Sequence, residues 1–436
     1  MPPTKIFDIT SSTSISTSLL SPNSKGVVLI RLPSSCNLVR KRQRVLDVTR
    51  RLLCREANEK EVIELKENGL ISDVPKSNTG AVSSAACQVR QLGADFAKEY
   101  DNNNAEEEEM GRSSIRKNVQ SLSSIMYEAI AAVCKSCDDA LGLTSSDKSL
   151  SSVLARSESA KARMIYYHAL VNGDDNDAEE KEKIDGKIVA KKEKRKEEEE
   201  EFDSDISNLG NWQAWHYDYG LFTALISPQL LSSSGLHRGE EDVEQEEEGN
   251  ATKIGDDSMK DYSLEEESNT KSINRGGLLV LSSDTEMMTT STIMTKTKEK
   301  VYRIHIPRDA VAIQVGEAAA ILTGGRLKAC LHCVARPRIG TQLVQQKYTR
   351  QTFVLFAQPP WSQSMQALDT SLVKEDMEKG EKVEINSIYD SAHNDVILES
   401  LLVPALSHRF KPQMTFSEFA AKTTKAYYGK KTGKQV

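Results

Sequence analysis

The chain has 436 residues, a formal net charge of −7 at pH 7 and a mean hydropathy of −0.48. A pI near 5.7 indicates no basic surface large enough to bind nucleic acid. We expect no secretory signal and no membrane segment, because no apolar run approaches the roughly 20 residues that span a bilayer. Seven cysteines without a framework spacing favour reduced thiols, and therefore a cytoplasmic protein, with the nucleus as the alternative.

The first 150 residues are predicted to form an α-rich region with one short strand. Residues 25–32, KGVVLIRL, are apolar and β-branched, and this run has the length of a buried strand. Residues 37–70 and 114–141 repeat apolar side chains at helical spacing, which predicts two helices.

Residues 151–365 are predicted to form a β-rich core. Two charged runs, 174–205 and 239–274, cannot bury enough apolar surface to offset the entropy of ordering, and we expect them to be disordered insertions. The remaining short runs, separated by Gly, Pro, Asn and Asp, predict a mainly β fold of two antiparallel sheets with flanking α-helices. The predicted strands are 162–170, 212–226, 277–282, 301–306, 311–315, 327–334 and 353–358.

Residues 366–436 are predicted to form a helical extension of this core. The clearest helix is 414–428, because Thr415 and Glu418 have the spacing of a capping box.

The stretch WHYDYG places His216 and Asp218 two residues apart in an aromatic run. On a strand, positions two apart share a face, so an imidazole and a carboxylate would converge there. They are two of the three ligands of a 2-His-1-carboxylate site, which holds non-haem Fe(II). His332, on a later predicted strand, supplies the second histidine. Without it, an H-x-D pair is more often an ordinary half-buried polar pair.

A second pair of residues, which follows His332 in the sequence, is also expected to point to one face of a strand. Arg350 and Thr352 lie two apart in YTRQTFVLFAQPPW, and extended positions two apart share a face, so a guanidinium and a hydroxyl can bind one carboxylate together.

With these residues in place, the chain resembles the plant-type Fe(II)- and 2-oxoglutarate-dependent dioxygenases of the isopenicillin-N-synthase-like superfamily. HYDYGLFTAL is similar to that family's HTDYGLLTLL, and VGEAAAILTGGRLKACLH to its IGDxLxxLTNGxYxSxxHR. The resemblance covers about residues 162–361 once the two charged runs are removed. The family pattern H-x-D…H…R-x-S falls on His216, Asp218, His332, Arg350 and Thr352, with threonine in place of serine.

The resemblance implies a distorted double-stranded β-helix, or jelly roll, as the core. It also implies Fe(II) held by His216, Asp218 and His332, 2-oxoglutarate bound through its distal carboxylate by Arg350 and Thr352, and ascorbate as an accessory reductant. The implied reaction is hydroxylation, desaturation or demethylation of a small organic metabolite by dioxygen. Such a reaction is coupled to decarboxylation of 2-oxoglutarate to succinate and CO2.

The tyrosine strand is the part that departs most from the family. Tyr167 corresponds to the second tyrosine of the NYYP motif and, by resemblance, would add a hydrogen bond to the 2-oxoglutarate carboxylate. Ile165 and His168 replace the asparagine and the proline of that motif. This departure and the charged insertions leave an alternative function, in which a catalytically weak or inactive oxygenase fold acts as a binding or interaction module.

The cysteines offer a rival metal site. Two C-x-x-C pairs, Cys134 with Cys137 and Cys330 with Cys333, have a spacing used in tetrahedral zinc sites. The first pair falls in a predicted helix and the second on a strand, and neither has knuckle glycines, so buried free thiols are the favoured interpretation.

Overall fold

The structure is a computed structural model, and the predicted insertions 174–205 and 239–274 lie outside the residues that it describes. The described residues are 6–8, 12–54, 63, 82–90, 112–143, 147–157, 159–169, 212–232, 276–287, 295–339, 342–343, 348–369 and 395–428.

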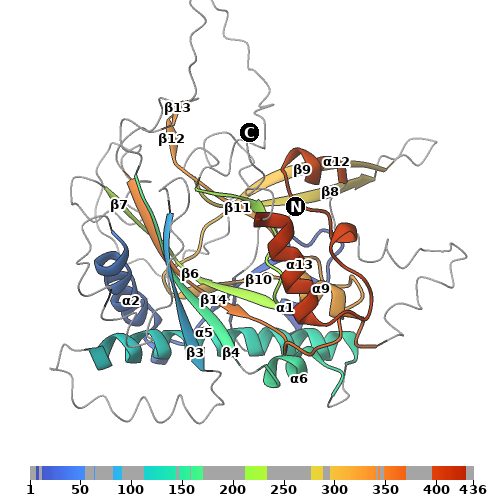
Figure 1. Cartoon of the computed structure of the whole chain (residues 1–436), viewed down its shortest axis with the longest axis horizontal. Coiled ribbons are helices and arrows are strands. Elements are labelled where there is room, and N and C mark those ends of the chain that lie inside the picture. The colour runs from blue at the N-terminus through green and yellow to red at the C-terminus, as the bar shows by residue number, and fades with distance from the viewer. Residues whose placement is uncertain are drawn as a thin grey trace, which may run out of the picture.

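Antiparallel strands form two main sheets, and helices flank them (Figure 1). The eight-stranded sheet has the order β1 (Ile6–Asp8), β2 (Val27–Arg31), β10 (Ala310–Val315), β6 (Phe222–Ile226), β14 (Tyr348–Ala357), β4 (Ser159–Tyr167) and β3 (Val82–Arg90), with β7 (Gln229–Ser232) also paired to β14. The four-stranded sheet has the order β5 (Gln213–His216), β11 (Leu331–Ala335), β8 (Gly277–Met287) and β9 (Thr295–Ile304). A two-stranded hairpin, β12 (Arg338–Ile339) with β13 (Gln342–Leu343), follows β11. Within these sheets, only β1 and β2 pair in parallel.

The helices of the first third lie along one side of the large sheet, with α5 running beneath β4 and β14 in Figure 1. The described helices are α1 (Ser12–Leu19), α2 (Leu38–Leu53), α5 (Arg112–Leu141), α6 (Leu150–Ala155), α9 (Glu317–Leu322), α12 (Asp395–Ser400) and α13 (Phe416–Tyr428), together with the short 3-10 helices η1 (Ser34–Cys36) and η5 (Leu406–His408).

Strand alternation divides the apolar residues among distinct cores. On β14, Phe353 and Leu355 pack toward the helices, whereas Val354 faces a core that also contains Leu278 and Val280 of the small sheet. The two sheets therefore pack face to face over this inter-sheet core. Positions 350 and 352 share the face of Val354, because successive side chains of a strand alternate. Arg350 and Thr352 are thus directed into the space between the sheets.

Most of the predicted elements are confirmed. The strand at 25–32 appears as β2, and the helix at 114–141 appears as α5. The helix at 414–428 appears as α13, and its capping box is formed: the Thr415 amide donates to Glu418 Oε2 at 2.8 Å, and the Glu418 amide donates to Thr415 Oγ1 at 3.3 Å.

Three predictions need correction. The helix predicted over 37–70 is not continuous, because α2 ends at Leu53 and Cys54 has an extended backbone; residues 55–62 and 64–70 of that prediction lie outside the described residues. The run 212–226 forms two strands in different sheets, because the chain turns between His216 and Phe222. The first 150 residues supply three described strands rather than one, and two of them, β2 and β3, pair with strands of the later core.

None of the described helices has the length and apolarity that a membrane crossing requires.

A buried carboxylate joins α5 to α6. The Leu150 amide donates to Asp138 Oδ1 at 2.7 Å, and the Ser151 amide donates to Asp138 Oδ2 at 2.9 Å. These are first-turn N–H groups of α6, which have no partner within the helix itself. Asp138 therefore fixes the start of α6 on the end of α5.

We expect Asp138→Ala to lower the free energy of unfolding by about 2 kcal/mol, because it leaves two amides at the helix start without their acceptor. Chemical denaturation measures this loss. The neighbouring Asp139 is exposed, and Asp139→Ala should change the free energy of unfolding by less than about 0.5 kcal/mol. Equal losses in the two variants would contradict the capping role of Asp138.

Candidate metal centre

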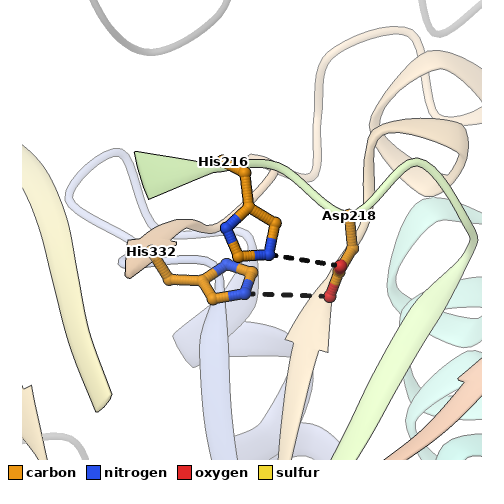
Figure 2. Close-up of side chains that lie close together, drawn as sticks. All are labelled: His216, Asp218 and His332. Atoms are coloured by element: carbon orange, nitrogen blue, oxygen red, sulfur yellow. Dashed lines mark ion pairs between the residues drawn. The ribbon is translucent and has the colours of Figure 1, made fainter. Parts of the chain in front are cut away.

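Three predicted ligands converge between the two sheets (Figure 2). His216 ends β5 and lies opposite His332 of the antiparallel neighbour β11. His216 Nε2 is 3.9 Å from Asp218 Oδ1, and His332 Nε2 is 3.9 Å from Asp218 Oδ2. The ligand atoms of all three residues lie within 4.8 Å of one another. In the part of the chain that the structure describes, this is the one group of three or more His, Cys, Asp or Glu residues close enough to hold a metal ion.

The reason for this convergence differs from the predicted one. His216 and His332 lie on strands β5 and β11, whereas Asp218 lies in the turn that follows β5. The turn is fixed by its backbone, because the Asp218 carbonyl accepts a hydrogen bond of 2.8 Å from the Glu317 amide at the start of α9. The turn and α9 are in close contact, since a Cβ on Gly316 would lie 2.2 Å from the Gly220 carbonyl oxygen.

Both histidines have a tautomer suited to metal binding. The Nδ1 of His216 lies 2.8 Å from the Ala214 carbonyl, and the Nδ1 of His332 lies 3.0 Å from the Cys330 carbonyl. A carbonyl oxygen only accepts, so each Nδ1 must carry the proton. In the neutral form of each ring, Nε2 then presents a lone pair on the side of Asp218.

The surroundings of His216 favour its neutral form, which is the form that binds a metal cation. Burial, and then the neighbouring His332, lower the pKa of His216 to about 4, although Asp218 opposes the shift. His216 is therefore neutral at pH 7, as a metal ligand must be.

The carboxylate of Asp218 is held by a further residue. Thr223, on β6, donates from its hydroxyl to Asp218 Oδ2 at 2.6 Å. Ligands about 2.1 Å from a common ion lie about 3 Å apart when they subtend a right angle. The observed separations of 3.9 Å thus require the side chains to approach by about 1 Å when an ion binds.

A second group of residues lies on the inner face of β14. Arg350 and Thr352 are 2% and 1% exposed. Among the described residues, neither Arg350 Nε nor Thr352 Oγ1 has a hydrogen-bond partner. Buried polar atoms without partners cost about 1 to 3 kcal/mol each, so this pair fits a ligand that supplies acceptor oxygens, such as a carboxylate.

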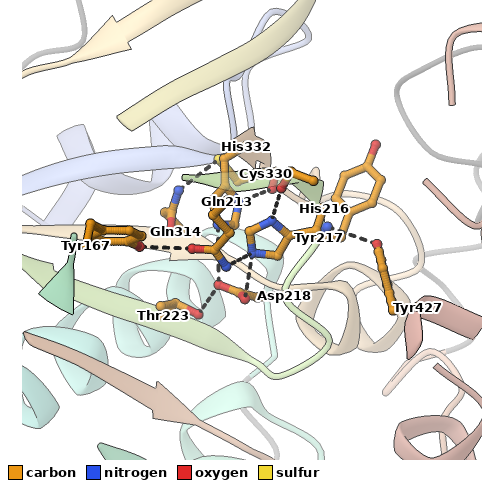
Figure 3. A network of polar contacts seen from close by, with 11 residues as sticks. Tyr167, Gln213, His216, Tyr217, Asp218, Thr223, Gln314, Cys330, His332 and Tyr427 are labelled. Carbon is orange, nitrogen blue, oxygen red and sulfur yellow. Dashed lines mark hydrogen bonds and ion pairs between the residues drawn. The ribbon is translucent and has the colours of Figure 1, made fainter. Parts of the chain in front are cut away.

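Tyr167 lies between this pair and the metal centre, and Figure 3 shows its contact on the side of the metal centre. It lies opposite Arg350 in the β4–β14 pairing, with its ring 5.3 Å from the guanidinium carbon. Burial raises the pKa of Tyr167, although Arg350 opposes the shift, so the phenol is protonated and donates. It donates at 3.0 Å to Gln213 Oε1, and Gln213 Nε2 lies 3.0 Å from His216 Nε2.

The carboxy-terminal segment supports the turn from its far side. The Tyr217 amide, between the two ligands, donates to the Tyr427 hydroxyl of α13 at 3.1 Å. Arg409 forms a buried, bidentate ion pair with Glu317 and also donates to Thr423 of α13 at 3.1 Å. Residues distant in sequence thus clamp the backbone of the ligand turn.

The rival zinc site is not formed among the described cysteines. Cys134, Cys137, Cys330 and Cys333 are buried free thiols, as the favoured interpretation predicted. Burial raises the pKa of each of them, so the thiols stay protonated.

Several residues of this centre were not found from the sequence: Gln213, Thr223, Glu317, Arg409 and Tyr427. Gln213 precedes His216 by three residues and Thr223 follows Asp218 by five, so closeness in sequence was the one signal that pointed to these two contacts. Glu317, Arg409 and Tyr427 contact the centre through pairings that join distant parts of the chain.

No family model matches this sequence, and neither does any curated protein. Similar solved structures include the dioxygenase for auxin oxidation 1 of Arabidopsis thaliana with 2-oxoglutarate, at 12% identity and a TM-score of 0.42 over 85% of this chain and 97% of that chain. The rice dioxygenase for auxin oxidation has 11% identity and a TM-score of 0.40 over 84% and 87%. A full-length Neurospora crassa protein in complex with alpha-KG has 10% identity and a TM-score of 0.40 over 83% and 86%. These TM-scores are below 0.5, so the function proposed for this chain depends on its own residues alone.

Breaking the Arg409–Glu317 pair should destabilise the protein. We expect Arg409→Met to lower the free energy of unfolding by about 3 to 5 kcal/mol, because it leaves the Glu317 carboxylate buried without its partner. Denaturant unfolding measures the change. The double variant Arg409→Met/Glu317→Leu should recover most of it, and Lys411→Met, at an exposed site, should lose less than about 0.5 kcal/mol. A double variant as unstable as the single one would show that the unpaired charge is not the cause of the loss.

Proposed function

We propose that the protein is an Fe(II)- and 2-oxoglutarate-dependent dioxygenase with a jelly-roll core, acting on a small organic metabolite. The observation that supports this most directly is the combination of two features in one inter-sheet space. His216, Asp218 and His332 form a 2-His-1-carboxylate set, and Arg350 and Thr352 carry buried donor atoms that have no partner among the described residues and fit a carboxylate. Either feature alone is compatible with many kinds of protein, whereas both together fit a metal ion and a dicarboxylate co-substrate.

His216, Asp218 and His332 would hold the iron. Three protein ligands leave positions open for the co-substrate and dioxygen. When bound, Fe(II) supplies the activation of dioxygen that is coupled to decarboxylation of 2-oxoglutarate. The chain contributes imidazoles of fixed tautomer and a carboxylate oriented by Thr223, with His332 buried and the other two ligands half-buried.

Arg350 and Thr352 would bind the distal carboxylate of 2-oxoglutarate. Their orphan Nε and Oγ1 atoms are donors on one face of β14, which matches the acceptor oxygens of a carboxylate. Tyr167 lies beside the guanidinium, and its hydroxyl contacts Gln213. We therefore assign Tyr167 to the wall of the co-substrate site rather than to direct carboxylate binding.

The substrate is a small molecule in this proposal, with hydroxylation, desaturation and demethylation as the reaction types open to such a centre. An acidic chain with a net charge of −7 favours neither nucleic acid nor an anionic membrane as a partner. We propose a cytoplasmic protein, with the nucleus as the alternative.

Anaerobic addition of Fe(II) and 2-oxoglutarate should produce a weak visible charge-transfer band, which absorbance difference spectra measure. We expect Asp218→Ala to abolish the band, because it removes the one anionic ligand. If the wild-type protein shows no band, or Asp218→Ala shows the same band, the enzyme proposal fails. A binding or interaction module would then be the better interpretation.

Removing the carboxylate-binding pair should weaken co-substrate binding without removing the metal. We expect Arg350→Leu to lower the affinity for 2-oxoglutarate on the order of 100-fold, and Thr352→Val about fivefold, from the loss of a charged and a neutral hydrogen bond. Titration of the same band gives both values. Thr349→Val is the matched control, because Thr349 lies on the same strand with its hydroxyl toward Tyr166, and it should bind 2-oxoglutarate as wild type does.

A further inference from the structure

Gln213 owes its position to an irregularity in the small sheet. In the β5–β11 pairing, His216 faces His332 and Gln213 faces Val334, with a register shift between the two pairs. Three steps along β5 therefore match two steps along β11, so β5 carries one extra residue. On a regular strand, positions three apart point to opposite faces. The extra residue turns Gln213 to the side of His216, as bulges beside functional sites do.

The amide of Gln213 connects the two binding sites, as Figure 3 shows. Its Oε1 accepts from the Tyr167 hydroxyl at 3.0 Å, and its Nε2 lies 3.0 Å from His216 Nε2. His216 carries its proton on Nδ1, which donates to Ala214, so Nε2 accepts. The Gln213 NH2 group is consequently the donor in this contact, and the opposite orientation of the amide would set its oxygen against a lone pair.

That lone pair is the one a metal ion needs. An imidazole nitrogen has a single lone pair, so His216 Nε2 cannot accept from Gln213 and bind a metal at once. A metal ion must therefore break the Gln213–His216 hydrogen bond. The released NH2 group remains beside the metal, because Oε1 is still held by Tyr167.

We propose that Gln213 is a positioning residue that exchanges partners: its amide holds His216 Nε2 until a metal ion binds, and then donates to an oxygen of the co-substrate beside the metal. This inference rests on the proposed function for its second half, and on the metal centre alone for its first half. Because the Gln213–His216 hydrogen bond must break first, the exchange lowers the affinity of the three ligands for the metal. It raises the affinity of the metal-loaded site for the co-substrate, because the released NH2 group donates to it. Gln213 thus couples the two binding events.

The test uses Co(II), whose visible spectrum reports binding without any turnover, and then 2-oxoglutarate added to the Co(II)-loaded protein. We expect Gln213→Leu to bind Co(II) about fivefold more tightly, because no hydrogen bond has to be broken first. The same variant, loaded with Co(II), should bind 2-oxoglutarate about fivefold more weakly. A mere loss of structure would weaken both affinities, so the opposite signs identify the exchange.

Two further variants make the test specific. Gln213→Ala removes the amide and leaves space, so it should show the same pair of opposite changes if the bulk of leucine is not their cause. Gln314→Leu is the matched control, because the Gln314 amide contacts the Cys330 thiol rather than a ligand nitrogen, and both affinities should stay at the wild-type values.

Each outcome decides between the proposals. Co(II) affinity that is unchanged or weaker in both Gln213 variants overturns the exchange, even if wild type binds 2-oxoglutarate. Tighter Co(II) binding in both variants supports the first half. If the Co(II)-loaded wild type then binds no 2-oxoglutarate, the proposed function and the second half fail, while the competition for His216 stands.

Discussion

The centre depends on one backbone constraint: Asp218 lies in a turn rather than on a strand. Its carbonyl is held by the Glu317 amide, and the adjoining turn lies against Gly316 at the start of α9. This hydrogen bond fixes where the carboxylate points, and a turn without such a partner would leave the carboxylate free to face solvent. The two histidines need less support, because sheet pairing already places His216 opposite His332.

The turn that carries Asp218 is supported by a buried ion pair and by the hydrogen bonds around it. Arg409 and Glu317 are 2% and 3% exposed, and two buried charges are tolerated only when they are paired and further hydrogen-bonded. Arg409 meets this requirement through both carboxylate oxygens of Glu317 and the hydroxyl of Thr423. Because either charge would be unfavourable if it were buried alone, the carboxy-terminal segment packs against the core in the position that pairs Arg409 with Glu317. The ligand turn is thereby fixed from a segment about 200 residues later in the chain.

A polar path runs from the inner face of the large sheet to β5 of the small sheet, through an otherwise apolar core. Arg350 lies beside Tyr167, Tyr167 donates to Gln213, and Gln213 donates to His216. Each side chain restricts the orientation of the next, so a change of hydrogen-bond partner at one end alters the orientations along the path. The orphan atoms of Arg350 and Thr352 lie at the end of this path away from the histidines, where a ligand would complete the hydrogen bonding. Such a path provides a physical route for coupling between a metal ion and a bound carboxylate.

Local patterns predicted the elements whose cause is local. The amphipathic repeat of α5 and the capping box of α13 involve residues three or four apart, so the sequence contains all of their determinants. The same holds for Arg350 and Thr352, which share a face simply because β14 alternates. The end of the helix at Leu53 and the pairing of β3 with β4 were not predicted, since packing and long-range pairing decide them.

The sequence by itself determined which side chains are available at this centre and their approximate order on strands: His216, Asp218, His332, Arg350 and Thr352. Only the tertiary structure decided how they meet. Asp218 lies in a turn rather than on the expected strand, and a bulge in β5 turns Gln213 to the side of His216. The physical reason is that side chains alternate between the two faces of a strand, so a single stretch of sequence shows which of them share a face. Turns, bulges and buried ion pairs are instead fixed by hydrogen bonds between distant segments.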